Sequence, residues 1–195
     1  MACAPNALAA LFPTVPIMTK ITVSFLEAKG NISEAAKNGV AEWSKVMCKA
    51  PYFANDILQN LEVIEMNIIE GGDELGTGKK QAQMVFELDV TEDLCNPIGS
   101  LHGGCTAALV DQCTSMVIAL LSQYISPGHD IHVSVALNTT FHAPAMLGTR
   151  IRIISTTVAS GKRLRTAKTE IYDQTRKSLV ATGLHIKIAP SMSKL

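Results

Sequence analysis

The segment from Asn96 to Tyr124 constrains the fold of this chain more than any other part of it. It opens with a turn and a His-Gly-Gly step and continues as a long apolar run that we expect to be helical. From His102 to Tyr124 the only side chain that is normally charged at neutral pH is Asp111. Burying a lone carboxylate in so apolar a helix costs free energy unless the group is paired or used. We therefore expect the chemistry of the protein in this segment.

The composition fits one domain with its own core. The 195 residues suffice for a single domain with an additional N-terminal piece, and for a core that needs no disulfide bonds. Lys plus Arg and Asp plus Glu both number 17, so the chain lacks the basic excess typical of nucleic-acid-binding proteins, and we expect no nucleic-acid partner. All the arginines lie in the last third of the chain, which allows a local basic patch there.

The cysteines indicate a reducing compartment. Their number is odd, and neither a Cys-x-x-Cys pair nor a Cys/His ligand spacing is present, which argues against a disulfide framework and a structural zinc site. The apolar N-terminus lacks the arginines of a typical mitochondrial transit peptide. The sequence leaves both the cytoplasm and the mitochondrion open as locations. The cysteines are Cys3, Cys48, Cys95, Cys105 and Cys113.

The chain divides into three parts. Within the second part, a helix is expected from Ser33 to Ala50, with Ser33 as its N-cap and Pro51 as its stop. The most apolar run of the third part, Ala107–Leu121, falls short of the roughly 20 residues of a membrane span, so no span is expected. The parts are a loosely ordered tail, a helical extension and the main domain, at residues 1–30, 31–52 and 53–190.

Alternating apolar residues predict strands on both sides of the long helix. Those before it read as a hairpin, whose glycine-rich connection lacks the spacing of phosphate-binding loops. Those after it follow one another at hairpin distances and are expected to form a four-strand meander. A helix that is apolar almost all round needs cover on most of its surface, and a curved antiparallel sheet supplies it, so we predict an α+β fold. The expected strands are residues 57–70 (one strand or two short ones), 81–90, 132–141, 149–158, 163–172 and 178–188.

Gly103 and Gly104 lie where the long helix is expected to begin. The first N–H groups of a helix lack internal partners and carry the positive end of the helix dipole. Because Gly103 has no Cβ, a ligand oxygen can approach these groups, which makes the helix start a site for an oxyanion or a polarised carbonyl. The two glycines equally fit a tight entry turn with no further role, and the sequence leaves both interpretations open.

His102 and Asp111 cannot easily serve one site within one chain. Asp111 follows His102 by nine residues, which on a regular helix is about 900° of rotation and about 13–14 Å of rise. The two side chains then point to opposite sides, and a second copy related by a two-fold axis would bring them together twice. Alternatively, Asp111 is a buried acid bonded to backbone or to Ser115, and His102 satisfies a loop carbonyl.

Three stretches of the chain together resemble a known family. They are Asn96–Gly104 (NPIGSLHGG) followed seven residues later by Asp111, Val133–Gly148 (VSVALNTTFHAPAMLG) and Leu179–Lys187 (LVATGLHIK). The chain resembles the hotdog-fold acyl-CoA thioesterases of the PaaI type over roughly residues 55–188. The resemblance implies a hotdog fold, in which a curved antiparallel sheet wraps one long helix. It also implies hydrolysis of acyl-CoA thioesters to a fatty or aryl acid and CoA.

The resemblance assigns the thioester carbonyl to the turn and the helix start. The Asn96 side chain and the Gly103 N–H would bind and polarise the carbonyl, with Gly104 beside them in the substrate site. His102 would position the thioester region or the leaving thiolate. An amide donor together with helix N–H groups suits a developing oxyanion.

The same resemblance assigns the attacking water to two other residues. Asp111 of the opposing subunit would be the general base, or less favourably a nucleophile. Ser134, on the small and polar face of its strand, would help to hold the water. No metal and no cofactor are expected, since CoA is part of the substrate and the sequence offers no ligand set for a metal.

The last expectations concern the basic residues of the chain and its oligomeric state. Lys162, Arg163 and Arg165 would contact the phosphates of CoA, although each of them equally fits a solvated hairpin tip. The expected partners are acyl-CoA and further copies of the chain, as a homodimer or homotetramer with shared active sites. The alternative function is a non-catalytic acyl-CoA or lipid-binding module of the same fold. A hotdog hydratase is disfavoured, because the position five residues after Asp111 is Met116 and not a histidine.

Overall fold

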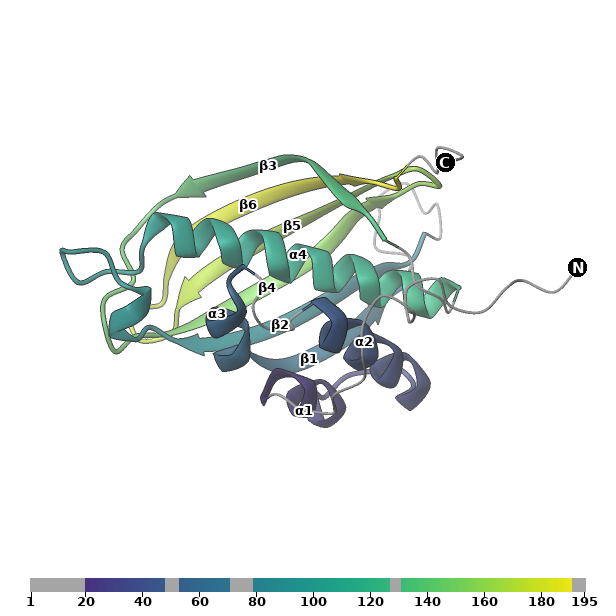
Figure 1. Cartoon of the computed structure of the whole chain (residues 1–195), viewed down its shortest axis with the longest axis horizontal. Coiled ribbons are helices and arrows are strands. Elements are labelled where there is room, and N and C mark those ends of the chain that lie inside the picture. The colour runs from purple at the N-terminus through teal and green to yellow at the C-terminus, as the bar shows by residue number, and fades with distance from the viewer. Residues whose placement is uncertain (1–19, 48–52, 71–78, 127–130, 191–195) are drawn as a thin grey trace, which may run out of the picture.

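The computed structural model describes residues 20–47, 53–70, 79–126 and 131–190 (Figure 1). Within these ranges the helices are α1 (Lys20–Glu27), α2 (Glu34–Met47), α3 (Asn55–Asn60), the 3-10 helix η2 (Glu92–Leu94) and α4 (Gly103–Ile125). The strands are β1 (Glu62–Ile69), β2 (Gln81–Asp89), β3 (Val133–Phe141), β4 (Arg150–Ser160), β5 (Leu164–Asp173) and β6 (Ser178–Ile188).

The strands form one antiparallel sheet in the order β1-β2-β4-β5-β6-β3. The sheet curves around α4, which runs along its concave face, while α1 and α2 pack beside β1 and α4 (Figure 1). The sheet buries the apolar side chains of α4, which is the arrangement expected of the predicted α+β fold. The architecture predicted from the sequence is confirmed.

The predicted four-strand meander is wrong in one connection. β4, β5 and β6 are consecutive neighbours, but β3 pairs with β6 at the far edge, and β4 pairs with β2. Charge complementarity supports the β2–β4 pairing, because Arg152 contacts Glu87 across it at 2.9 Å and Arg150 contacts both Glu87 and Asp89, at 2.9 and 3.0 Å. Apolar alternation along a strand indicates which of its residues face the core, but it does not indicate which other strand pairs with that strand.

Close packing between α4 and the sheet fixes the middle of the domain. A Cβ on Gly183 of β6 would lie 2.3 Å from Cγ1 of Val110 on α4, so only glycine fits at this position. By length and composition, α4 is long and apolar enough to cross a membrane, unlike the shorter run Ala107–Leu121 considered in the sequence. However, 78% of its most apolar stretch is buried inside the protein. That burial is what a core helix of a sheet protein shows. The strand expected at residues 81–90 is confirmed as β2, and its residues Ala82, Met84, Phe86 and Leu88 are buried in the core.

The N-terminal part corrects two expectations. Residues 20–27, placed in a loosely ordered tail, form α1, and its side chains Ile21 and Phe25 are fully buried. Residues 57–60, placed in a strand, belong to α3. The helix expected from Ser33 is confirmed as α2, and the Ser33 hydroxyl accepts the Ala36 N–H at 3.3 Å. Residues 1–19, the expected stop at Pro51 and the expected turn at 71–78 lie outside the described residues.

The two edges of the sheet differ in their cover. On the β1 edge, the Lys29 N–H donates to the Ile64 carbonyl at 3.0 Å, and the Lys29 carbonyl accepts the Met66 N–H at 2.8 Å. The Asn31 side chain also bonds both backbone groups of Ile68, at 2.7 and 2.8 Å. The β3 edge instead exposes apolar side chains, namely Val133, Val135, Leu137 and Phe141. The β1 edge is therefore closed to a further strand, while the β3 edge presents an apolar surface.

Candidate active site

His102 caps the start of α4 with its own side chain. Its Nδ1 accepts the Gly104 N–H at 2.9 Å, and its carbonyl accepts the Thr106 N–H at 2.9 Å. The Gly104 N–H is thus already engaged within the chain. No acceptor in the described part of the chain takes the Gly103 N–H. Of the two glycines, Gly103 is the one whose N–H is available to a ligand.

Asn96 is held in a tight turn just before the helix. Its Oδ1 accepts the N–H groups of Ile98 and Ser100 at 3.1 and 3.2 Å, and its Nδ2 donates to the Ser100 hydroxyl at 2.9 Å. The Asn96 N–H also donates to the Ser100 carbonyl at 2.8 Å. A side-chain amide carries two N–H hydrogens, so one remains for a ligand while the oxygen holds the amide in place.

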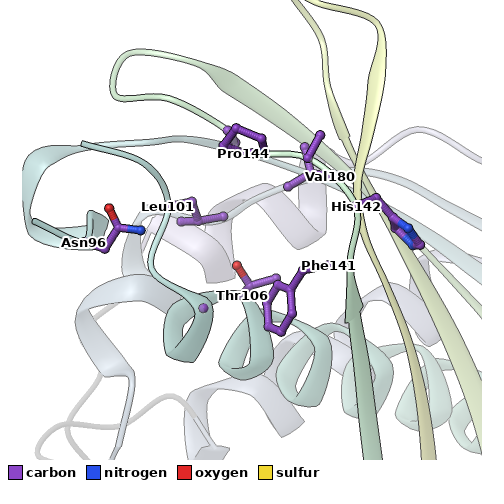
Figure 2. Close-up of a pocket in the computed structure, with 10 residues that line it drawn as sticks. Asn96, Leu101, Thr106, Phe141, His142, Pro144 and Val180 are labelled. Atoms are coloured by element: carbon purple, nitrogen blue, oxygen red, sulfur yellow. The ribbon is translucent and has the colours of Figure 1, made fainter. Parts of the chain in front are cut away.

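Asn96 and Gly103 meet in one pocket of about 350 Å³ (Figure 2). Its polar lining comes from Asn96, the Gly103 backbone, Thr106 and His142, and the other lining side chains are apolar. The Phe141 ring lies against Gly103, with its nearest atoms 3.5 and 3.6 Å from where a Cβ would be. N–H donors aimed into an apolar cavity polarise a carbonyl more strongly than they would in water. The remaining lining residues are Leu101, Ala143, Pro144, Ala145 and Val180.

Asp111 lies elsewhere on α4. It is about one-third exposed, its Oδ2 accepts from the Gln112 side chain at 3.1 Å, and its Oδ1 lies 3.5 Å from Nε2 of His185. The Ser115 hydroxyl donates to the Asp111 backbone carbonyl at 2.7 Å and not to the carboxylate. The interpretation of Asp111 as a buried acid satisfied by Ser115 is therefore wrong.

His185 of β6 joins Asp111 to Ser134. Its Nε2 lies 2.9 Å from the Ser134 hydroxyl, and its Nδ1 lies 2.7 Å from the Thr114 hydroxyl. The ring is fully buried, and burial lowers the pKa of His185 to about 4. The value of about 4 already includes a lowering of the pKa by the nearby Lys187 ammonium and an opposing rise from the Asp111 carboxylate. His185 is therefore neutral at pH 7.

His185 and Lys187 are functional candidates that the sequence reasoning missed. The Lys187 ammonium donates to the Ser115 hydroxyl at 2.7 Å, and burial lowers the pKa of Lys187 while Asp111 raises it. A signal was available, because Gly183, His185 and Lys187 alternate along β6 and share the face toward α4. Two polar residues on the inner face of a strand are unusual unless they have partners there.

The basic residues separate into two kinds. Lys162 and Arg163 are exposed at the β4–β5 hairpin, in keeping with either interpretation of this tip. Arg165 is partly buried, and its guanidinium donates to the Ser122 hydroxyl on α4. Arg165 thus has a protein partner in this structure.

Two groups of functional side chains therefore lie apart on one chain. Gly103, beside Asn96, begins α4, and Asp111 follows eight residues later, which is about 12 Å along the helix axis. Asp111 and Ser134 are not among the residues that line the pocket. The donors at the helix start and the acid further along the same helix thus occupy two separate places within one curved sheet.

The chain belongs to the thioesterase superfamily. The model of that family matches residues 98–180. The mouse protein acyl-coenzyme A thioesterase 13 is 35% identical over 105 residues, which are 54% of this chain and 71% of that protein. The human protein of the same name is 36% identical over 105 residues, again 54% of this chain and 71% of that protein.

Solved structures agree on the fold. Zebrafish thioesterase superfamily member 2 is 30% identical to this chain and superposes on it with a TM-score of 0.60. The superposition covers 78% of this chain and 97% of the zebrafish chain. The PaaI protein of E. coli, from the phenylacetic acid degradation operon, has a TM-score of 0.59 over 79% of this chain and 95% of its own. At 19% identity, PaaI supports the fold alone. The predicted hotdog fold and the PaaI-type resemblance are confirmed.

Proposed function

We propose that this protein hydrolyses acyl-CoA thioesters to the free acid and CoA. The relatives named acyl-coenzyme A thioesterase 13 support the substrate class. The observation that carries the proposal is the convergence of Asn96 and the free Gly103 N–H on an apolar pocket. Such a pocket suits an acyl group whose carbonyl needs two donors.

The carbonyl is bound at the helix start. Its oxygen accepts from the Gly103 N–H and from the unused N–H of Asn96. As the carbonyl carbon becomes tetrahedral, negative charge develops on this oxygen, and both donors and the helix dipole stabilise it. His102 caps the helix through Nδ1, so its contribution is to fix the position of the Gly103 N–H.

Asp111 is the general base in this proposal. It takes one proton from water as the water oxygen bonds to the carbonyl carbon, and Ser134 helps to hold that water. When the tetrahedral intermediate collapses, the C–S bond breaks and the electron pair leaves on the CoA sulfur. The proton held by Asp111 passes to the thiolate directly or through solvent, which restores the carboxylate.

Two subunits share each active site in this proposal. A carbonyl bound at Gly103 is about 12 Å along the axis from Asp111 of the same chain, but a general base must lie within hydrogen-bond reach of the water. The partner's Asp111 and Ser134 meet this requirement if two copies associate through the β3 edge. That edge exposes apolar side chains, whereas the β1 edge is covered by residues 29–31. A homodimer is the minimal unit, and a homotetramer of two such dimers is compatible with it.

The exposed Lys162 and Arg163 are proposed to contact the phosphates of CoA. Arg165 belongs to this proposal only if it exchanges its Ser122 partner for a phosphate. The reaction as written needs neither a metal nor a cofactor, since water, the carboxylate and the substrate balance it.

The test is thiol release from a panel of acyl-CoA substrates of different chain lengths, including an aryl-CoA, by protein dialysed against a chelator. We expect release with at least one substrate, and loss of nearly all of it in Asp111→Asn. Tight acyl-CoA binding without release of thiol would instead support the non-catalytic binding module. An Asp111→Asn enzyme that keeps its activity would refute the assignment of the base.

A further inference from the structure

The hydroxyl of Thr114 fixes the tautomer of His185. Its oxygen lies 2.6 Å from the Val110 carbonyl and 3.0 Å from the Asp111 carbonyl, and carbonyls only accept, so its one proton is used there. The same oxygen lies 2.7 Å from Nδ1 of His185 and therefore accepts the Nδ1 proton. A neutral imidazole carries one proton, so Nε2 presents a lone pair.

The lone pair of His185 leaves two acceptors for a water. The Ser134 hydroxyl, 2.9 Å from Nε2, donates its proton to that nitrogen and keeps its oxygen lone pairs for a donor from outside. The Asp111 carboxylate, 3.5 Å from the same nitrogen, has no ring proton to bind. A water beside these two residues can donate one hydrogen to the Ser134 oxygen and the other to the carboxylate.

A second proton on the His185 ring would remove both acceptors. The imidazolium would donate from Nε2 and form an ion pair with the Asp111 carboxylate beside it. The Ser134 hydroxyl would lose its acceptor and have to turn its lone pair to the ring. A carboxylate bound to an imidazolium is a weaker base toward water, so the charge of His185 decides whether this half of the site works.

The groups around His185 act on its charge in opposite directions. From α4 the Asp111 carboxylate favours the charged ring, and from β3 Ser134 contributes a neutral hydroxyl. From β5 the residue opposite His185 is Ala167, which carries no charge. From β6 the Lys187 ammonium opposes protonation, and together with burial it lowers the pKa of His185 to about 4.

The Lys187 ammonium is held near His185 by α4. It donates to the Ser115 hydroxyl at 2.7 Å, and that hydroxyl gives its own proton to the Asp111 carbonyl at 2.7 Å. Thr114 and Ser115 are consecutive, so His185 and Lys187, two residues apart on one face of β6, are tied to the same turn of the helix. Without this bond, a lysine side chain would tend to turn its ammonium toward water.

We propose that Lys187 is a positioning residue whose ammonium, held by Ser115, keeps a second proton off His185, so that Ser134 and Asp111 stay available to the water. The arrangement of donors, acceptors and charges stands on the structure alone, and its effect on rate rests on the proposed hydrolysis of acyl-CoA.

The direct test is an NMR titration of the His185 ring in wild type, Lys187→Met and Lys187→Arg. We expect wild type to carry its proton on Nδ1 at pH 7 and to titrate with a pKa of about 4. In Lys187→Met the midpoint should rise by about one pH unit, because a neighbouring positive charge is gone, and in Lys187→Arg it should stay near wild type. A wild-type proton on Nε2, or equal midpoints in wild type and Lys187→Met, would overturn the proposal.

Two further variants separate the held charge from other effects. Ser115→Ala keeps the Lys187 charge but releases it, so the midpoint should rise by less than in Lys187→Met, and an unchanged midpoint would refute the role of Ser115. The matched control is Lys168→Met, which removes an exposed lysine from β5 opposite Leu184. If Lys168→Met raises the midpoint as much as Lys187→Met, the effect is one of net charge and the proposal fails.

The kinetic test compares kcat at pH 5 with kcat at pH 8 in the same proteins. A midpoint raised by about one unit leaves about half of the rings charged at pH 5, so this ratio should be about twofold lower in Lys187→Met than in wild type. Lys168→Met should keep the wild-type ratio. A raised midpoint without a lowered ratio would refute the positioning role. A wild-type protein that releases no thiol would refute the proposed function, while the titrations still decide what holds the charge of His185.

Discussion

The Asp111 carboxylate lies 3.5 Å from Nε2 of His185, and the Gly103 N–H at the start of the same helix is about 12 Å away along the helix axis. The acid on α4 therefore lies with His185 of β6 and Ser134 of β3, whereas Gly103 at the start of α4 lies with Asn96 of the preceding turn. This separation is the reason for expecting a site that two chains share.

Gly103 offers a clean way to remove one N–H. It occupies the first helical position, where proline is tolerated, and the preceding His102 has φ −63° and ψ 136°, which proline accepts in its neighbour. We expect Gly103→Pro to fold and to lose about 10²–10³ in kcat, the usual cost of one oxyanion donor. Gly103→Ala keeps the N–H, and its Cβ would meet Phe141 at ordinary distances of 3.5 and 3.6 Å, so it should fold and lose less kcat than Gly103→Pro, any loss reporting the crowding of the ligand by the Cβ. Equal kcat in the two variants would show that the Gly103 N–H does not bind the carbonyl.

The contact between Gly183 and Val110 predicts a stability effect with a built-in rescue. A Cβ at residue 183 would overlap Val110, so Gly183→Ala should lower the free energy of unfolding by about 1–3 kcal/mol. Val110→Ala should also destabilise, by leaving a gap. Because the two changes compensate in volume at one contact, the double variant should be more stable than additivity predicts. Denaturant unfolding of all four proteins measures the coupling, and additive values would contradict the packing described here.

His185 predicts how stability depends on pH. Its pKa is lowered in the folded protein from the ordinary 6.5 to about 4, so the unfolded chain binds more protons between these values. Stability from this residue is present above pH 6.5, falls as the pH drops toward 4, and changes no further below that. The slope is at most about 1.4 kcal/mol per pH unit. Unfolding at several pH values should show this slope in wild type and a flatter profile in His185→Gln; parallel profiles would refute it.

The exposed cations predict an effect on binding and not on chemistry. Lys162→Ala with Arg163→Ala should raise KM for acyl-CoA and leave kcat nearly unchanged, and the effect should shrink as salt is added. Lys168, an exposed lysine on β5, provides the matched control, since Lys168→Ala should leave KM unchanged. A lowered kcat with unchanged KM would instead place these residues in the chemistry.

The sequence predicted those features that depend on local periodicity. The apolar run after His102 became α4, and the alternation from Ala82 to Leu88 became the inward face of β2. It did not predict that β4 lies beside β2, because register between distant strands is decided by cross-strand partners such as Arg152 and Glu87. Residues 20–27 were placed in the tail, and the structure shows that they form α1, in which Ile21 and Phe25 are buried.

Of the candidate site, the sequence predicted the residues on α4 better than those that meet it from the sheet. Asn96 and Gly103 line one pocket, and their role toward a carbonyl stays a prediction. His185 was overlooked, although it lies inside a stretch used for the resemblance, because its importance depends on the contacts with Asp111, Ser134 and Thr114. These contacts join two strands and a helix, and no spacing along the chain reports them.

The most direct test of the shared site is complementation between two inactive variants. Asp111→Asn and Gly103→Pro, carrying different affinity tags, are produced together, and the mixed dimers are isolated through both tags. Each mixed dimer then has one intact site, made of Gly103 from one chain and Asp111 from the other, and should recover about half of the wild-type activity per dimer. Mixed dimers that form but remain as inactive as their parents would contradict the account.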